Sequence, residues 1–156
     1  MNTGALDAMD HTLYRLRMLA ESMDERATRA REAAECIRAA RGYHWVGLYD
    51  VTPSSIAAIA WTGTNAPAHP TFPRAQGLNG AAVAAGTPIV VQDVRDDPRY
   101  LTTFGATRAE AIFPVQTRDG RVTGTIDVES DQVDAFKAED RRFLELCAGA
   151  LEPFWR

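Results

Sequence analysis

Cysteine is scarce in this sequence, and its scarcity excludes several classes of protein. The 156 residues contain two cysteines, Cys36 and Cys147, and neither belongs to a C-x-x-C pair. The histidines His11, His44 and His69 are too far apart to give the ligand spacing of a zinc site. The sequence therefore predicts no disulfide framework, no metal and no cofactor, and a cytoplasmic location fits best.

Long apolar runs and clusters of basic residues are missing as well. No stretch of 18 apolar residues could span a membrane, and the first residues lack the basic-then-apolar layout of a signal peptide. The net charge is −4, and Lys137 is the only lysine among 17 basic residues. Because nucleic-acid binding relies on basic patches, we expect neither nucleic acid nor a membrane as a partner.

The composition is that of one globular domain. With 46% apolar and 24% charged residues, the chain can form a single core that buries roughly 68–70% of its unfolded surface. Apolar residues three and four apart predict a helix from Leu6 to Ala20. A second helix is predicted from Asp24 to Arg41, ended by Gly42, and a last one starts near Ala138.

Between the helices, the apolar pattern changes to the two-residue period of strands. Strands are predicted at 43–51, 56–61, 88–92, 110–118 and 121–129. Residues 62–77 are predicted to form an irregular loop, and Asn79 is expected to cap a short helix over 80–85. Hairpins join most strands, so the predicted class is α+β with a mostly antiparallel sheet of five to six strands.

The dipeptide Asp119-Gly120 is typical of a tight hairpin turn and predicts the pairing of the last two strands. With these residues at the turn, Glu110 lies opposite Glu129, and Ile112 lies opposite Asp127. Side-chain alternation then brings the three carboxylates to one face. The other face, which we expect to form the core, carries Ala111, Phe113, Val115, Val122, Gly124, Ile126 and Val128.

Like charges directly opposite each other destabilise a sheet, so three clustered carboxylates need compensation. A cation, an ammonium group, an arginine or retained protons would supply it, unless this face is open to water. Trp45 and Tyr49 share one face of the first long strand with Tyr43 and Gly47. Aromatic rings beside carboxylates favour an alkylammonium ligand, and plain core packing is the alternative.

The segment from Gly77 to Val94, with Asp96-Asp97-Pro98-Arg99-Tyr100 after it, resembles a GAF domain. The strands around Pro114 and Gly124 and the closing helix extend the resemblance to about residues 24–152. The resemblance implies a GAF domain over 24–156, preceded by an N-terminal helix over 1–23 that the apolar spacing predicts. It also implies that the terminal helices pack on one face of the sheet and that a ligand pocket lies on the other.

Within GAF domains, the chain is most similar to the free methionine-(R)-sulfoxide reductases. The shared segments are Trp45-Val46-Gly47-Leu48-Tyr49, Glu110 before the Pro114 strand, and Ile126-Asp127-Val128-Glu129-Ser130. In that family, the matching aromatic and acidic residues hold the amino group of free methionine sulfoxide. The resemblance thus implies a ligand-binding site of Trp45, Tyr49, Glu110, Asp127 and Glu129.

The chain departs from this family at its redox cysteines. His69, Asn79 and Thr103 stand at the three positions where the family has them. Threonine and asparagine cannot supply a thiolate nucleophile or a resolving disulfide. We therefore expect no catalytic residues and a pocket without the reductase chemistry.

The expected function is that of a small-ligand-binding, sensory or regulatory GAF protein whose ligand bears an amino group. One alternative is a free methionine-(R)-sulfoxide reductase-like enzyme with unusual chemistry. Another is a sensor of a small anion such as nitrate, held at the helix start near Gly80. The third is a dimerising adaptor, because Leu13, Leu16, Phe143 and Leu146 lie on helical stripes that favour a homodimer.

Overall fold

One antiparallel sheet of six strands organises the chain, in the order β3-β2-β1-β6-β5-β4. The computed structural model describes residues 3–156, without the side chains of residues 3, 5 and 6, so the place of Leu6 on the predicted apolar stripe lies outside the description. The elements are α1 (Thr3–Glu21), α2 (Arg26–Arg41), β1 (Trp45–Val51), β2 (Ser55–Thr62), β3 (Thr71–Pro73), α3 (Gly77–Ala85), β4 (Ile89–Val91), η1 (Val94–Asp96), β5 (Ala109–Gln116), β6 (Val122–Ser130), α4 (Ala138–Leu151) and η2 (Glu152–Trp155).

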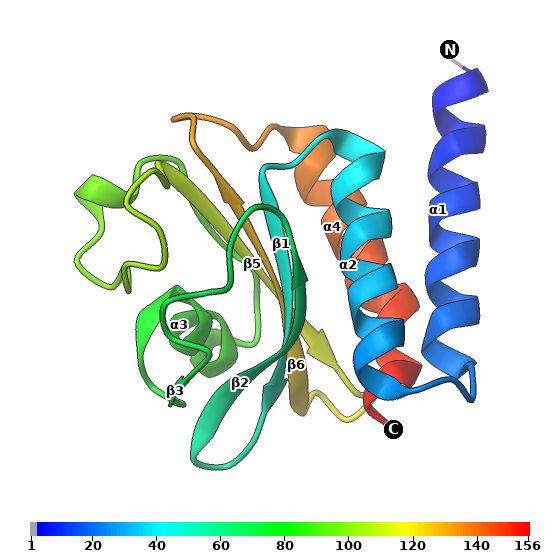
Figure 1. Cartoon of the computed structure of the whole chain (residues 1–156), viewed down its shortest axis with the longest axis horizontal. Helices are drawn as coiled ribbons and strands as arrows, with labels where there is room; N and C mark the ends of the chain where they lie inside the picture. The colour runs from blue at the N-terminus through cyan, green and yellow to red at the C-terminus, as the bar shows by residue number, and fades with distance from the viewer. Residues whose placement is uncertain (1–2) are drawn as a thin grey trace.

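The helices divide between the two faces of the sheet. Helices α1, α2 and α4 lie on one face with α1 outermost, and α3 lies with several loops on the other face (Figure 1). This arrangement confirms the predicted α+β class and the predicted placement of the terminal helices. The sequence missed β3, a three-residue strand within the stretch predicted to be an irregular loop.

The main core lies between the sheet and the three helices. Of the residues predicted to form the core face of the β5–β6 hairpin, Ala111, Phe113, Val115, Ile126 and Val128 are all buried there. The stripes expected to support a homodimer face inward, because Leu13, Leu16 and Phe143 are buried within the same core. Of the four residues on these stripes, Leu146 alone is accessible, at 38% exposure. The homodimer therefore remains a prediction, without support from the three buried residues.

The β5–β6 hairpin has the predicted register far from its turn and a different register near it. Glu110 pairs with Glu129 and Ile112 with Asp127, as predicted. At the turn, however, the Thr117 N–H donates to the Arg121 carbonyl, so the loop has three residues and ends on Gly120 in the left-handed region. An irregularity next to Val115 and Gln116 adds one residue to β6 and restores the register beyond it.

This extra residue corrects the prediction for Val122. A bulge inverts the alternation of side chains on its far side. Val122 therefore leaves the main core and packs with Trp45 and Tyr49 on the opposite face of the sheet.

Tyr43 was predicted to share a face with Trp45, Gly47 and Tyr49, but it lies on the other side of the sheet. It precedes β1 and packs in the main core, where its hydroxyl donates to Asp140 Oδ1 over 2.9 Å. Asp140 also accepts from the Arg41 guanidinium and from the Lys137 backbone N–H at the start of α4. This network ties α2 and the segment before β1 to α4.

We expect Tyr43→Phe to destabilise the protein by about 1–2 kcal/mol, because Asp140 would lose a buried hydrogen-bond donor. Urea unfolding measures the change. Tyr14→Phe is the matched control, since Tyr14 is 60% exposed and should change stability by less than about 0.5 kcal/mol. Equal effects of the two substitutions would contradict a structural role for the Tyr43–Asp140 contact.

Candidate functional site

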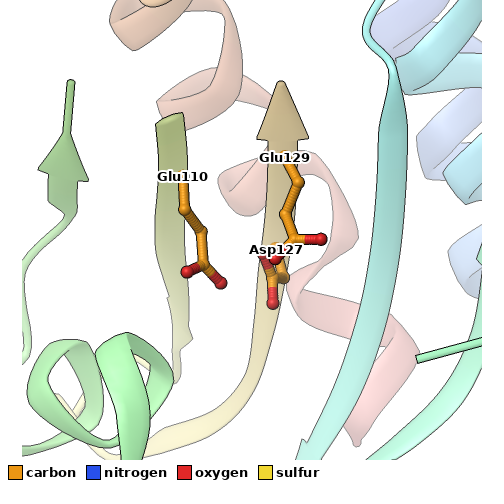
Figure 2. A group of neighbouring side chains, drawn as sticks. All are labelled: Glu110, Asp127 and Glu129. Atoms are coloured by element: carbon orange, nitrogen blue, oxygen red, sulfur yellow. The ribbon is translucent and has the colours of Figure 1, made fainter. Parts of the chain in front are cut away.

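Three carboxylates meet on the face of the sheet that α3 covers. Glu110 projects from β5, and Asp127 and Glu129 project from β6, with their carboxyl groups turned toward one another (Figure 2). All three are buried, and one oxygen from each lies within 4.8 Å of the others. This face is therefore not open to water, and the sequence alternative that left the carboxylates in solvent is wrong.

The cluster lacks partners for several of its oxygens. Asp127 Oδ1 and both oxygens of Glu129 accept no hydrogen bond. Within residues 3–156, no arginine, lysine or histidine forms an ion pair with Glu110, Asp127 or Glu129. Because an isolated buried charge is costly, compensation comes from retained protons or from a bound cation.

The side chain of Asn79, on α3, fixes the orientation of Asp127. Its amide Nδ2 donates to Asp127 Oδ2 over 2.9 Å, and its Oδ1 accepts from the Thr125 hydroxyl over 2.6 Å. Asn79 was predicted to cap the helix, but α3 begins earlier, at Gly77 with Gln76 as its N-cap, so Asn79 lies inside the helix and is buried. Its spacing from the buried Ala82 and Val83 could have indicated this inward position.

Burial raises the pKa of each of the three carboxyl groups. The pKa of Asp127 rises to about 6, although hydrogen bonds from Glu110 and Asn79 oppose the shift. Burial, followed by the charge of Asp127, raises the pKa of Glu129 to about 9, which the nearby hydroxyls of Thr103 and Thr107 only partly offset. Burial and the charges of the other two carboxylates hold the pKa of Glu110 well above its usual range.

The rings of Trp45 and Tyr49 lie against the middle of β1, beside these carboxylates. Trp45 pairs with Glu129 and Tyr49 with Thr125, while Gly47 between them pairs with Asp127. A Cβ on Gly47 would lie 2.4 Å from the Trp45 ring and 3.0 Å from the Tyr49 ring. Trp45 and Tyr49 therefore lie with the carboxylates on one face, as predicted, because the glycine between them leaves room for both rings.

A small cavity reaches this cluster from the protein surface. Its lining consists of Tyr49, His69, Phe72, Gly77, Leu78, Asn79, Leu101, Thr103, Glu110 and Asp127. Of the five predicted site residues, Tyr49, Glu110 and Asp127 line it, and Trp45 and Glu129 are buried beside them. The space open to the centre of a water molecule is about 10 Å³, enough for one water, so a larger ligand requires its walls to move.

The positions expected to match the reductase cysteines meet in the same cavity. His69, Asn79 and Thr103 come from three separate segments and all line it. The two cysteines of the chain lie elsewhere, since Cys147 is buried in the main core and Cys36 packs against that core. A larger depression of about 660 Å³ lies beside the start of β1 and the end of β6, around Tyr43 and Asp140, whose polar groups already bond to each other.

No helix among residues 3–156 is both long enough and apolar enough to cross a membrane.

Comparison with known proteins identifies the family. The family model of the GAF domain matches residues 20–152. YtsP of Bacillus subtilis is 24% identical over 135 residues, which cover 86% of this chain and 82% of YtsP. The structure of free methionine-R-sulfoxide reductase from Neisseria meningitidis in complex with its substrate has a TM-score of 0.82 and 25% identity, covering 99% of this chain and 92% of that one.

A second solved structure shows the same likeness. Type II free methionine-R-sulfoxide reductase from Thermoplasma acidophilum has a TM-score of 0.75 and 27% identity, covering 90% of this chain and 97% of that one. With the family model spanning most of the sequence and the sheet between terminal helices and a covered pocket, the chain belongs to the GAF domain family.

Proposed function

We propose that this GAF domain binds a small molecule with a protonated amino group, which Glu110, Asp127 and Glu129 hold. The observation that carries the proposal is the set of unpartnered carboxylate oxygens in a buried cluster, Asp127 Oδ1 and both oxygens of Glu129. An ammonium group has three N–H donors and a positive charge, and so matches both the oxygens and their charge. The ring of Tyr49 lines the same cavity and favours a cation.

The start of α3 supports a ligand that also carries a carboxylate. Gly77, Leu78 and Asn79 form the first turn of this helix and line the cavity. The first N–H groups of a helix have no partner within it, and here the N-cap side chain of Gln76 makes no capping bond. An anionic group is stabilised at such a position, so the cavity offers a partner for each of the two charges of a free amino acid.

The proposed role is binding in a sensory or regulatory protein, without reduction of the ligand. Free methionine sulfoxide is a candidate ligand, because the similar structures from N. meningitidis and T. acidophilum are named as its reductases. Reduction needs a thiolate, and His69, Asn79 and Thr103 supply none at the cavity. Burial raises the pKa of both Cys36 and Cys147, which keeps these thiols protonated and unreactive. A cytoplasmic location belongs to the same proposal.

Thermal unfolding with a panel of ligands tests the proposal. Methionine, methionine sulfoxide, N-acetylmethionine and nitrate form the panel. We expect the two amino acids to stabilise the protein, by about 2.7 kcal/mol at a hundred times Kd, and N-acetylmethionine to have no effect because its amine is blocked.

Asp127→Asn should abolish the stabilisation, and Asp131→Asn should preserve it, because Asp131 is an exposed carboxylate outside the cluster. Stabilisation by nitrate alone would contradict the amine proposal and favour the anion sensor. Consumption of methionine sulfoxide with dithiothreitol as donor would contradict binding without reduction.

A further inference from the structure

We propose that Glu110, Asp127 and Glu129 also form a binding site for a hard divalent cation such as Mg²⁺, Ca²⁺ or Mn²⁺. The cation would occupy the position of the ligand's ammonium group. This inference goes beyond the proposed function and does not rest on it, because it requires only the three carboxylates and their surroundings.

The separation of the carboxylate oxygens fits a single ion. One oxygen from each of the three residues lies within 4.8 Å of the other two. Metal–oxygen bonds of about 2.0–2.6 Å place any two ligand atoms of one ion within about 5 Å of each other. The side chains already converge from β5 and β6 (Figure 2), so no strand has to move to bring them together.

The unpartnered oxygens point to a ligand at the cluster, independently of this spacing. Glu129 is fully buried, and neither of its oxygens accepts a hydrogen bond. Asp127 Oδ1 is also buried and also lacks a hydrogen-bond partner. Buried polar atoms without a protein partner are rare, and where they occur they often contact a bound ion or water.

A second layer of contacts orients one of the proposed ligands. Asn79 fixes Asp127 Oδ2, and Thr125 fixes Asn79 in turn, so Asp127 Oδ1 keeps a defined direction. Metal-binding carboxylates are typically held by such outer hydrogen bonds. The charge balance also favours a dication, which brings two positive charges to a cluster that can carry three negative ones, whereas an ammonium group brings one.

The chemistry of the donors selects the class of metal. All three are carboxylates, with neither sulfur nor imidazole, and such sites suit hard cations in preference to zinc or copper. The adjoining cavity has room for about one water molecule, which could complete the coordination. Since the same oxygens cannot hold both a metal ion and an ammonium group, the two occupants should compete.

Mn²⁺ titration of the full chain, followed by electron paramagnetic resonance after removal of bound metals with EDTA, tests the inference. We expect one Mn²⁺ per chain. Asp127→Asn and Glu129→Gln should each weaken its binding at least tenfold, because loss of even an outer contact typically costs 10–100-fold in metal affinity. Asp131→Asn should bind Mn²⁺ as the wild type does, since Asp131 is exposed and outside the cluster.

Wild-type binding that is unchanged in both cluster variants would overturn the inference, because the ion would then occupy the acidic surface. No binding at all would overturn it as well. Circular dichroism identifies a variant that fails to fold, and the other variant then decides. If Mn²⁺ binds the cluster while amino acids do not stabilise the protein, the proposed function fails and this inference stands. If amino acids stabilise the protein while Mn²⁺ does not bind the cluster, this inference fails and the proposed function stands.

Discussion

Without ligand or metal, the protein is expected to become less stable as the pH rises from about 5 to about 9. The cause lies in the buried carboxylates, which hold their protons more tightly in the folded chain than in the unfolded one. Glu129 has a pKa of about 9 in the folded protein against 4.5 as a free side chain, and Asp127 has about 6 against 3.8.

The direction follows from proton binding. Below about pH 3 both states hold these protons, and folding is not penalised. Between the two pKa values of a group, the unfolded chain has released the proton and the folded chain has not, so stability falls as the pH rises. Each retained proton costs about 1.4 kcal/mol per pH unit. From pH 6.5 to 8.5, Glu129 alone should therefore lower the free energy of unfolding by about 3 kcal/mol, and Glu110 should add to the loss.

Glu129→Gln should make this dependence shallower by about 1.4 kcal/mol per pH unit, because the variant has one ionisable group fewer in the cluster. Urea unfolding across the pH range in EDTA measures it. Glu145→Gln serves as the control, since Glu145 is exposed on α4 and its removal should leave the slope unchanged. A wild-type protein that gains stability from pH 6.5 to 8.5 would contradict the retained protons.

The second large effect is expected from Gly47→Ala. The new Cβ would lie 2.4 Å and 2.8 Å from two atoms of the buried Trp45 ring, and 3.0 Å from the Tyr49 ring. Neither ring is a flexible end that can turn away, since both side chains are at least 98% buried, with relative exposures of 1% and 2%. Overpacking a core typically costs about 1–3 kcal/mol, and this substitution should lie at the upper end because it meets two rings at once.

Gly149→Ala is the matched control for Gly47→Ala. Gly149 lies on the exposed side of α4, and a Cβ there would meet nothing within 4 Å. Alanine has a higher helix propensity than glycine, so the control should stabilise the protein by up to about 1 kcal/mol. Opposite signs in urea unfolding are therefore expected. If Gly47→Ala were neutral, the two rings could not be held against β1 as the structure has them.

The predicted hairpin register was correct at Glu110 and Glu129, although its turn was not the predicted one. The three-residue loop ending at Gly120 and the bulge next to Val115 each shift the pairing by one residue, and the two shifts cancel. Strand alternation could therefore bring the three carboxylates together. Val122 lies between the two irregularities and is on the unexpected face, because local sequence does not indicate where a bulge forms.

The residues of the candidate site also differ in whether the sequence alone could group them. The residues of one hairpin and one strand could be grouped from their period, because neighbours in an antiparallel sheet follow directly from side-chain alternation. Asn79 could not be assigned to this group from the sequence, because its contact with Asp127 joins residues 48 positions apart and depends on how α3 lies over the sheet. Nor does a sequence show whether a polar face is covered.

By itself, the sequence determined the fold class, the terminal helices and the common face of Glu110, Asp127 and Glu129, all of which follow from local periodicity. Only the tertiary structure decided that this face is buried, that Asn79 and Thr125 orient Asp127, and that Leu13, Leu16 and Phe143 are covered within the chain. Burial depends on which elements pack over a surface, and that packing is set by contacts between distant parts of the chain.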